Sequence, residues 1–290
     1  MPLYLTDPDP WRLTLPVNCM LCQLQPHEGF FEHYHDAMEI IAVVQGSMDC
    51  TADSRSCSLG VGDVIVFNPY TVHSGFMTAK DTEYLCLTFL LSEVLNFPDS
   101  VLSRCVDSLE TGQNVFDERY PAGGEDGAAL FGHMERLYRD LRSGTPESEV
   151  SVLTELYGIF GILFARHYRV NTESSVRKKS LKFLRQLSAY MAAHYWQPIT
   201  TEDAAQALFM SASHFSHVIR QNFNLSFSEY LRKYRLNCAM RYGTDTPKSV
   251  RQISEAVGFT DYAYFSRVFK EYTGVTPGVY FSKRKRRSGK

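Results

Sequence analysis

A short sequence near the end of the chain occurs twice, and this repeat restricts the fold of the last third of the molecule more than any other feature. FSHVIR at residues 215–220 recurs as FSRVFK at residues 265–270, an offset of fifty. Upstream, Ala-Leu at 207–208 matches Ala-Val at 256–257 with an offset of forty-nine. The second copy therefore has one additional residue in the turn between the matching segments.

Each copy predicts a helix-turn-helix unit, in which a short amphipathic helix is followed by a tight turn and a second amphipathic helix. The two units span residues 201–223 and 250–272. Because no strand pattern interrupts them, residues 180–290 are expected to form a small all-helical domain. The predicted helices are 181–194, 201–208, 211–223, 226–241, 250–257 and 261–272.

The second helix of each unit has an apolar face and a polar face, because residues three and four apart lie on the same side of a helix. The polar faces hold small, hydrogen-bonding and cationic side chains, which suit a helix that lies in the major groove of DNA. They consist of Ser213, Ser216, His217 and Arg220 in the first unit, and of Tyr262, Ala263, Tyr264, Ser266, Arg267 and Lys270 in the second.

Arg267 is the residue that we expect to read a base, since a well-aligned arginine contact to guanine contributes about 1 to 3 kcal/mol of discrimination. Arg220 and Lys270 are expected to contact phosphates, and His217 occupies the place of Arg267 in the first unit. The alternative is a charged, solvated face without DNA contacts, which is a common arrangement on surface helices.

The net charge of −2 conceals two halves of opposite sign. Residues 1–175 contain 10 Lys and Arg against 25 Asp and Glu, a net charge of −15. Residues 176–290 contain 20 against 7, a net charge of +13. This division predicts a basic module that binds a polyanion, most simply nucleic acid, joined to an acidic module with another task.

The segment VRQISEAVGFTDYAYFSRVFKEYTGVTP at residues 250–277 resembles the signature of AraC/XylS-type bacterial transcription regulators. The resemblance covers roughly residues 179–283. It implies two recognition helices, joined by the helix at 226–241 and inserted in successive major grooves, about 34 Å apart on one side of the DNA. It also favours activation of transcription. The first unit departs from the pattern, with Phe209 where the second has Gly258.

The first hundred residues alternate between short apolar runs and turn residues, which predicts strands of a small antiparallel barrel or sandwich. Gln45-Gly46-Ser47 is predicted to be the turn of a hairpin between two of these strands. After about residue 100 the apolar period becomes helical, with helices predicted at 126–142 and 147–167. The predicted strand runs are 38–45, 47–52, 63–68 and 83–92, after a strand-like segment at 17–25.

The helix at 147–167 carries an apolar stripe that must pack on another surface. Two partners remain open: the strand domain of the same chain, or a second copy of the chain in a homodimer. The polar segment NTESSVRKK at 171–179 coincides with the change of charge sign and is predicted to be the linker between domains. The stripe consists of Val150, Leu153, Leu156, Tyr157, Phe160, Leu163 and Phe164.

Histidines and a carboxylate gather within the strand region. HYHDAME at 33–39, followed by Gly46 and by PYTVH at 69–73, resembles the two motifs of cupin barrels. His33, His35 and Glu39 have the same parity, so on an extended strand they would face one way. His73 is expected at a turn after the strand that ends at Phe67.

Three hypotheses account for this cluster. The favoured one is that His33, His35, Glu39, His73 and Tyr70 hydrogen-bond a small effector, such as a sugar, in the mouth of the barrel. The second is a divalent metal held by the three histidines and the carboxylate, although no cofactor is required by the first hypothesis. The third is a purely structural cluster. Candidate apolar walls are Tyr34, Met38, Phe67 and Tyr70.

Seven cysteines without a regular framework predict reduced thiols in a cytosolic protein. Cys19 and Cys22 form a CxxC, but residues three apart on a strand face opposite ways, which makes a poor chelate. No apolar run approaches the roughly 20 residues that cross a bilayer, and the start of the chain lacks the pattern of a secretion signal. We therefore expect a cytoplasmic bacterial protein without a membrane span, associated with the nucleoid when bound to DNA.

These features predict an α+β protein of two domains that acts as a ligand-responsive, sequence-specific transcription regulator. Its expected partners are double-stranded DNA, a small effector, RNA polymerase and a second copy of the chain, and its expected target is a metabolic, carbohydrate-related operon. The alternative is a metal-dependent cupin enzyme fused to DNA-binding helices, although no phosphate loop or nucleophile elbow indicates catalysis. The predicted divisions are a cupin-like effector-sensing barrel at 1–105, a helical packing or dimerisation region at 106–170, the linker at 171–179 and the DNA-binding domain at 180–290.

Overall fold

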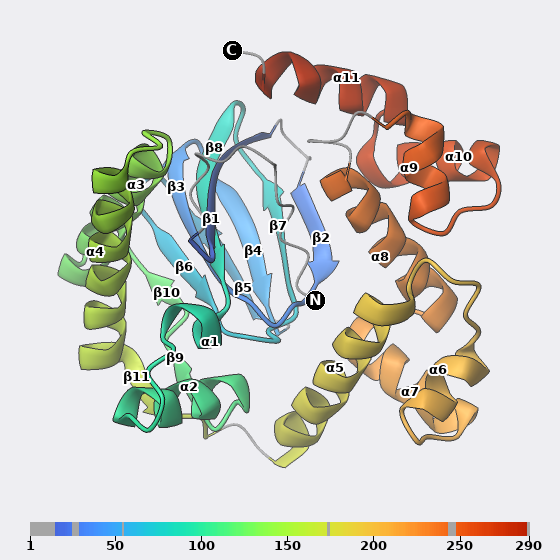
Figure 1. Ribbon diagram of the computed structural model, residues 1–290, viewed down its shortest axis with the longest axis horizontal. Helices are drawn as coiled ribbons and strands as arrows, with labels where there is room; N and C mark the ends of the chain where they lie inside the picture. The colour runs from blue at the N-terminus through green and yellow to red at the C-terminus, as the bar shows by residue number, and fades with distance from the viewer. Residues whose placement is uncertain (1–14, 25–28, 54, 173–174, 243–247, 289–290) are drawn as a thin grey trace. The chain divides into compact units, whose positions relative to one another are not determined.

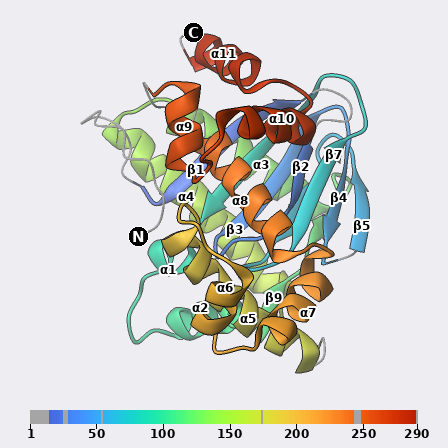
Figure 2. The same ribbon diagram turned by 90° about the vertical axis from the view of Figure 1, so that its right-hand side faces the viewer.

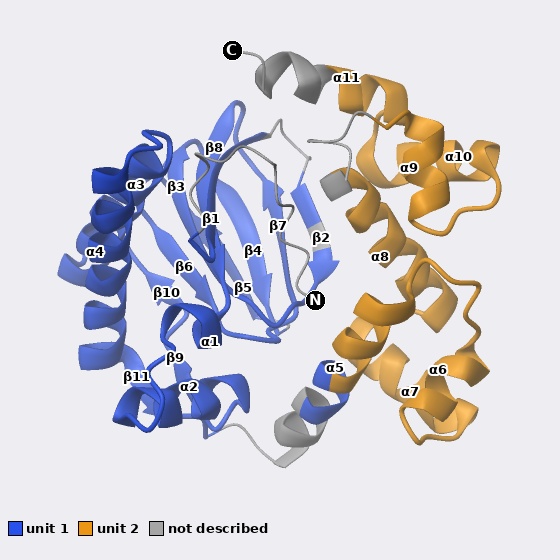
Figure 3. Ribbon diagram, viewed as in Figure 1, with its two compact units in different colours: residues 1–185 blue, residues 186–290 orange. Residues whose placement is uncertain are grey.

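The computed structural model describes residues 15–24, 29–53, 55–172, 175–242 and 248–288. The chain divides into two compact units, residues 1–185 and 186–290 (Figure 3). The first unit is rich in strands and the second is helical, so the predicted two-domain α+β class is confirmed. The opening residues, which carry the argument about a secretion signal, lie outside the described residues.

The strands of unit 1 form two antiparallel sheets whose inner faces pack together as a barrel (Figure 1). The five-stranded sheet has the order β1 (Val17–Leu24), β8 (Thr82–Phe89), β3 (Met38–Gln45), β6 (Val64–Phe67) and β10 (Arg119–Tyr120). The four-stranded sheet has the order β2 (Gly29–His33), β7 (His73–Met77), β4 (Met48–Ala52) and β5 (Arg55–Leu59) (Figure 2). A small third sheet pairs β9 (Asn114–Phe116) with β11 (Tyr168–Val170).

The turn at Gln45-Gly46-Ser47 does not close a hairpin, so that prediction is wrong. Strands β3 and β4 belong to different sheets, and β3 pairs with β6 and β8 instead. Gly46 has a φ of +78°, and a Cβ at this position would lie 2.5 Å from Oγ1 of Thr82. The glycine therefore serves a tight corner between two sheets. An alternating pattern indicates a strand and a turn but does not select the pairing partner.

Strand β3 is apolar along most of its length because both of its faces are covered. Ile40 and Ala42 contribute to the core between the five-stranded sheet and the helices, whereas Ile41 and Val43 contribute to the core inside the barrel. Since side chains alternate along a strand, Glu39 lies on the inner face with Ile41. The fold thus places one carboxylate among apolar side chains inside the barrel.

Helices cover the outer face of the five-stranded sheet. Helix α3 (Glu125–Leu141) packs on β1, β6 and β8, and helix α4 (Pro146–Ile162) packs on α3 (Figure 1). Helix α4 begins at a capping box in which Thr145 and Ser148 bond reciprocally, with Pro146 in the first turn. The remaining helices of this region are α1 (Leu91–Val94), α2 (Val101–Glu110) and the π-helical turn η1 (Leu163–His167).

The predicted apolar stripe on α4 and η1 divides between two environments. Leu156, Phe160 and Leu163 are buried in the core of unit 1. Val150 and Tyr157, in contrast, are 66% and 41% exposed. Packing on the strand domain therefore accounts for part of the stripe and leaves an outer edge uncovered in the chain.

The segment Pro146–His167 is long and apolar enough to cross a membrane, judged by length and composition alone. This differs from the expectation that no apolar run approaches that length. Within unit 1, however, Leu156, Ile159 and Leu163 of this segment are fully buried against the sheet and α3. Packing inside a protein core therefore accounts for part of the apolar composition.

Among the described residues, unit 2 contains helices and no strand, as the sequence predicts. Helix α5 begins at Ser175, so the last residues of the predicted linker, 175–179, are helical. Helix α11 was not predicted. The helices are α5 (Ser175–His194), α6 (Thr201–Ala207), α7 (Ala212–Phe223), α8 (Phe227–Tyr242), α9 (Val250–Ala256), α10 (Tyr262–Thr273) and α11 (Pro277–Ser288).

The two repeats form equivalent backbones. Helix α6 packs on α7 and α9 packs on α10, and in both turns one residue has a left-handed conformation. That residue is Phe209, at φ +57°, in the first turn and Gly258, at φ +92°, in the second. Two residues separate Gly258 from the N-cap Asp261, but only one separates Phe209 from the N-cap Ser211. The predicted insertion of one residue is therefore confirmed.

Candidate functional site

Helices α7 and α10 present the polar faces that the repeat predicts. In α7, Phe215 and Ile219 are fully buried and Val218 is half-buried. In α10, Phe265, Val268 and Phe269 are buried. The exposed residues are Ser213, Ser216, His217, Arg220, Tyr262, Ala263, Tyr264, Arg267 and Lys270, whereas Ser266 is half-buried.

The start of α10 is held by its N-cap. One carboxylate oxygen of Asp261 accepts hydrogen bonds from the backbone N–H groups of Ala263 and Tyr264, at 2.7 and 3.2 Å. An acidic N-cap satisfies two otherwise unpaired donors and interacts favourably with the positive end of the helix dipole. The cap therefore orders the first turn of α10, which is the part of a recognition helix that approaches base edges.

Arg267 does not extend freely into solvent. Its guanidinium lies over the ring of Tyr264, 5.4 Å from the ring centroid, which is within the range of a cation–π contact. The Tyr264 hydroxyl in turn accepts a long hydrogen bond of 3.4 Å from Nη1 of Arg232 on α8. The sequence gives no signal for Arg232, because the linker helix lacks the repeat pattern that identifies the recognition helices.

Residues 283–287 are all basic, a composition typical of a solvated chain end. The backbone of this run instead continues helix α11 to Ser288. Helix α11 contacts α9 and α10, and Phe281 packs beside Phe269 with ring centroids 5.6 Å apart. The side chains beyond Ser282 lie outside the described residues.

The second site lies inside the barrel of unit 1, where the four predicted side chains meet. The potential ligand atoms of His33, His35, Glu39 and His73 all lie within 4.8 Å of one another. His33 ends β2 and is the direct cross-strand partner of His73 at the start of β7. Glu39 lies on β3 of the opposite sheet.

The predicted route to this cluster is wrong even though the residues converge. His33, His35 and Glu39 do not share one strand: β2 ends at His33, the chain bends, and β3 begins at Met38. His73 likewise begins a strand and does not lie at a turn. Because β2 and β3 belong to different sheets, parity along one strand cannot relate them, and closure of the barrel brings the side chains together instead.

Hydrogen bonds to backbone carbonyls orient two of the imidazoles. Nδ1 of His35 donates to the Ala37 carbonyl at 2.9 Å, and Nδ1 of His73 donates to the Thr71 carbonyl at 2.8 Å. A carbonyl only accepts, so Nδ1 carries the proton in both rings. Nε2 of each ring points at Glu39, within hydrogen-bond distance at 3.0 Å for His35 and farther away at 3.7 Å for His73.

The electrostatics of Glu39 favour its charged form. Burial by itself would raise the pKa of this carboxyl, but its interactions with His35 and His73, at 3.0 and 3.7 Å, outweigh burial and hold the pKa well below its usual range. The charged carboxylate therefore faces two Nε2 atoms. Nε2 of His73 is buried and has no hydrogen-bond partner among the described residues.

Apolar and aromatic side chains surround the cluster. Phe67 stacks on the ring of His73 with centroids 4.3 Å apart, as expected for a wall residue. Tyr34 is buried. Met38, in contrast, contributes to the core between sheet and helices and does not line the cluster. Tyr70 is half-buried in the loop after β6, with a φ of +61°, and its N–H donates to the His35 carbonyl at 2.8 Å.

The cysteines pack as small apolar side chains. All seven are thiols outside any disulfide bond. Cys19 and Cys22 pack against opposite cores, one outside and one inside the barrel, as expected for residues three apart on a strand. Burial raises the pKa of Cys19 to about 12, so this thiol stays protonated near neutral pH. The CxxC is therefore not arranged to bind a metal.

Comparisons with known proteins agree with both parts of the chain. Residues 204–283 match the helix-turn-helix domain family, and residues 20–88 match the cupin domain family. The Msm operon regulatory protein of Streptococcus mutans is 28% identical over 82% of this chain and 81% of its own length. The melibiose operon regulatory protein of Escherichia coli is 21% identical over 88% of this chain and 84% of its own length.

A solved structure shows the same fold over nearly the whole chain. ToxT from Vibrio cholerae, crystallised with a bound unsaturated fatty acid, superposes with a TM-score of 0.61 at 14% sequence identity. The superposition covers 91% of this chain and 94% of that chain. The order of a barrel unit followed by a helical unit is therefore shared by the two proteins.

A cupin barrel followed by two helix-turn-helix units defines the class of DNA-binding regulators with an N-terminal sensor domain. Within that class, the chain is similar to the AraC/XylS-type bacterial transcription regulators, as the motif at 250–277 predicts. The relatives that match both parts of the chain are named as transcription regulators, which favours this function over a cupin enzyme.

Proposed function

We propose that this regulator binds an operator through both recognition helices and activates transcription of a metabolic operon in response to a small molecule. The observation that carries the proposal is the equivalence of α7 and α10, each of which exposes a polar, partly cationic face. The charge of +13 over residues 176–290 supports DNA as the partner, since phosphate contacts supply much of the affinity of such complexes. Binding of DNA implies a cytoplasmic location.

In this proposal the two recognition helices make different contacts with DNA. Arg267 reads a guanine in the major groove, and Lys270 and Arg220 contact phosphates. Ser213, Ser216 and His217 of α7 make weaker, neutral contacts to a second groove.

Selection of DNA sites from a random pool by the full-length protein tests the proposal. A single enriched sequence with two half-sites, about one helical turn apart, is expected. Arg267→Ala should lower the preference for that sequence over altered DNA, whereas the control Arg251→Ala, an exposed cation on α9, should weaken all sequences equally. No enrichment from the pool would contradict the proposal.

For the sensor, we propose that the barrel cluster holds a divalent metal ion. Donor atoms that surround one ion at about 2.0 to 2.2 Å lie about 3 to 4.4 Å from one another, which matches four ligand atoms within 4.8 Å. The orientation of Nε2 by backbone carbonyls, and the buried Nε2 of His73 without a partner among the described residues, both fit a metal ligand set.

His33, His35, Glu39 and His73 would hold the ion in this proposal. When bound, it would supply a Lewis acid with open positions for oxygen atoms of an effector at the barrel mouth, near Tyr70. We propose that the effector is a small metabolite. One relative is named for the melibiose operon, and ToxT was crystallised with a fatty acid.

Metal analysis of the full-length protein after mild purification tests the cluster. About one equivalent of Fe, Mn, Ni or Zn per chain is expected, and His73→Ala and Glu39→Gln should each abolish it. His133→Ala on α3 is the control, because this histidine pairs with Glu155 outside the barrel. A wild-type protein that takes up no ion, and whose melting temperature no ion changes, would show that the proposal is wrong.

Coupling between the sensor and DNA binding is proposed to act through the effector. Allosteric coupling typically amounts to about 1 to 3 kcal/mol, so an effector should shift operator affinity by about 5- to 150-fold, or shift recruitment of RNA polymerase instead. Thermal shift against sugars, fatty acids and metals would identify the effector, since a ligand at 100 times its Kd adds about 2.7 kcal/mol of stability.

A homodimer is proposed to form along the outer edge of α4. Val150 and Tyr157 are exposed there, and Phe97, which is 45% exposed, lies beside Tyr157 with ring centroids 6.5 Å apart. Sedimentation of the full-length protein should show a dimer that Val150→Asp with Tyr157→Asp converts to a monomer. Val61→Asp, at an equally exposed valine in the β5–β6 turn, should leave the dimer intact. A monomeric wild type would exclude this interface.

A further inference from the structure

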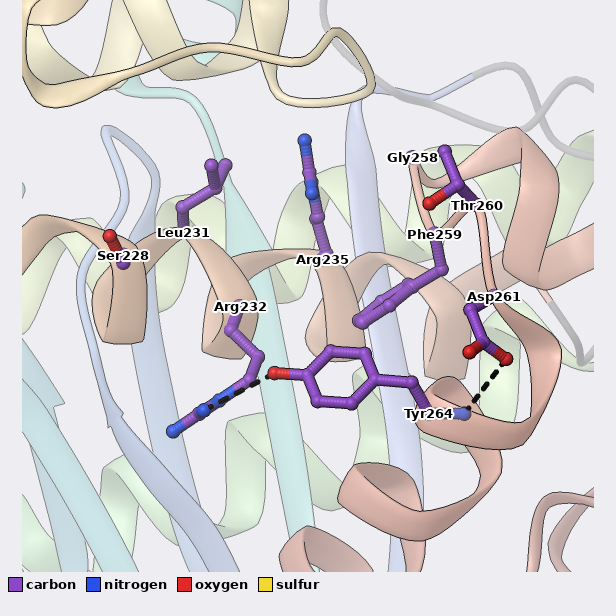
Figure 4. A pocket seen from close by; sticks show the side chains of 9 residues that line it. All are labelled: Ser228, Leu231, Arg232, Arg235, Gly258, Phe259, Thr260, Asp261 and Tyr264. Carbon is purple, nitrogen blue, oxygen red and sulfur yellow. Dashed lines mark hydrogen bonds between the residues drawn. The ribbon is translucent and has the colours of Figure 1, made fainter.

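A cavity in unit 2 lies between the linker helix α8 and the second recognition helix α10. Helix α8 lines it with Ser228, Arg232 and Arg235, and the turn before α10 lines it with Phe259 and Thr260 (Figure 4). Tyr264, from the first turn of α10, lies across the cavity with its hydroxyl directed at the guanidinium of Arg232. The Tyr264 phenol therefore lies between α8, which joins the two helix-turn-helix units, and α10, the helix proposed to read DNA.

Two arginines contact the same phenol in different ways. Arg232 donates to its oxygen at 3.4 Å, and Arg267 lies over its ring at 5.4 Å from the centroid. Tyr264 and Arg267 are three residues apart on α10, so helical geometry keeps them on one side. Tyr264 is 37% exposed, and the contact therefore forms at the edge of the DNA-facing surface and not in the core.

Contact with an aromatic face restricts the conformations of an arginine before it meets DNA. A free arginine side chain has considerable rotamer entropy, and some of it is lost whenever the guanidinium forms a bidentate contact with a base. An arginine already positioned over Tyr264 loses less on binding. This effect acts on the base contact of Arg267 and hence on discrimination between sequences.

Hydrogen bonds fix helix α8 to two neighbouring segments. Nε and Nη2 of Arg235 donate to the carbonyls of Tyr195 and Gln197, at 2.7 and 2.6 Å, in the segment that leads into α6. At the other end of α10, the Tyr272 hydroxyl donates to Oδ1 of Asn237 on α8, at 2.8 Å. Helix α8 is therefore a fixed support from which Arg232 holds the phenol.

We infer that Tyr264 is a positioning residue for Arg267, and that Arg232 of the linker helix holds Tyr264 in place. The inference rests on the proposed function, in which Arg267 reads a base. Sequence discrimination by the second helix-turn-helix unit then depends on Arg232, which lies outside both helix-turn-helix units. Neither Tyr264 nor Arg232 needs to contact a base for this effect.

The test compares binding of the full-length protein to two DNA duplexes: the sequence selected from a random pool, and the same sequence with the guanine under α10 replaced. The ratio of the two Kd values measures discrimination. Tyr264→Leu should lower this ratio about 2- to 5-fold, which corresponds to one exposed cation–π contact. Tyr264→Phe keeps the ring, so it should lower the ratio less, and Arg232→Gln should match Tyr264→Phe.

The matched control is Tyr138→Leu on helix α3 of unit 1, which removes a tyrosine ring that Arg142 approaches at 5.7 Å from the centroid, outside the proposed DNA-binding face. It should leave the ratio unchanged. The salt dependence of binding should also stay the same in Tyr264→Leu, because no phosphate contact is lost. In the Arg267→Ala background, Tyr264→Leu should cause no further loss of discrimination.

Three results separate the possibilities. If Tyr264→Leu weakens both duplexes equally, or if its effect adds to that of Arg267→Ala, Tyr264 does not position Arg267 and the inference is wrong. If Arg232→Gln reduces the salt dependence by about one phosphate contact, Arg232 binds DNA directly and does not serve to hold Tyr264. If Arg267→Ala itself leaves the ratio unchanged, the proposed base contact is wrong, and the inference falls with it.

Discussion

The two helix-turn-helix units have the same backbone but different residues where that backbone is most constrained. Each has a left-handed residue in the turn and another at the end of the recognition helix. In the second unit both are glycines, Gly258 and Gly274, whereas the first unit has Phe209 and Asn224. A side chain in the left-handed region costs roughly 1 to 2 kcal/mol, and asparagine tolerates it better than phenylalanine. In the second helix-turn-helix unit, glycines adopt the left-handed conformation without strain. In the first, the left-handed conformation of Phe209 and Asn224 depends more on packing of the surrounding helices.

The reading faces differ in the same direction. In the second helix-turn-helix unit the N-cap Asp261 accepts two backbone hydrogen bonds, and Arg267 lies over the ring of Tyr264. The first unit has a serine N-cap with one bond of 3.3 Å, and His217 in the place of the arginine. The difference indicates greater local order in the second helix-turn-helix unit, where the proposed discrimination between DNA sequences is concentrated. Four substitutions test this contrast, and they are given from the largest expected effect to the smallest.

Gly258→Ala should destabilise unit 2 by about 2 to 4 kcal/mol. A Cβ here would lie 2.7 and 2.9 Å from backbone atoms of Trp196, and the φ of +92° adds strain of its own. Thermal unfolding followed by circular dichroism measures the loss. Gly278→Ala, in open space on helix α11, is the matched control and should be neutral or stabilising. Equal stability of the two variants would remove the backbone contrast between the units.

Arg267→Ala should reduce discrimination for the selected operator by about 5- to 150-fold, the range expected for an arginine contact to guanine. His217→Ala should reduce it only about 5-fold, which corresponds to one neutral hydrogen bond. Competition binding against singly altered operators measures both values. Similar losses in the two variants would show that the units contribute equally to sequence recognition.

Asp261→Ala should destabilise α10 by about 1 kcal/mol, because two backbone N–H groups lose their acceptor. Ser211→Ala should have a smaller effect, since its single cap bond to His214 is 3.3 Å long. Asp261→Ser should restore part of the stability. The melting temperatures of the three variants decide the order, and a larger loss in Ser211→Ala would reverse the comparison.

Phe209→Gly should stabilise unit 2 by up to about 1 kcal/mol. The substitution relieves the left-handed strain, and because Phe209 is 95% exposed, almost no packing is lost. The gain is limited by the larger entropy of glycine in the unfolded chain. Phe209→Ala retains the strain and serves as the control, with little change expected. A loss of stability in Phe209→Gly would mean that the phenyl ring contributes to the fold.

Much of unit 2 could be predicted from the sequence because its determinants are local. The repeat defines both units, helical periodicity separates Phe215 and Phe265 from the exposed faces, and the offset of forty-nine predicts the inserted turn residue. Helix α11 was missed because its apolar residues are few and the run at 283–287 has the composition of a solvated tail. Arg232 was missed because its contact with Tyr264 depends on how α8 lies against α10.

Unit 1 was predicted less completely, since its contacts join residues far apart in the chain. The strand at 38–45 was predicted with its observed bounds, but its partners β6 and β8 were not. The residues of the barrel cluster were identified by type and motif, whereas the reason given for their convergence was wrong. Parity relates residues along one strand only, and the pairing of His33 with His73 lies across two strands.

The sequence by itself determined that the chain has an acidic half rich in strands and a basic half with two helix-turn-helix units, because charge and periodicity are properties of neighbouring residues. It also determined which side chains were candidates for each site. Only the tertiary structure decided that Glu39 meets three histidines inside the barrel, and that Arg232 and Arg267 share the phenol of Tyr264. Those arrangements depend on which strands pair and which helices pack, and pairing and packing are settled by the burial of the whole core and not by any local pattern.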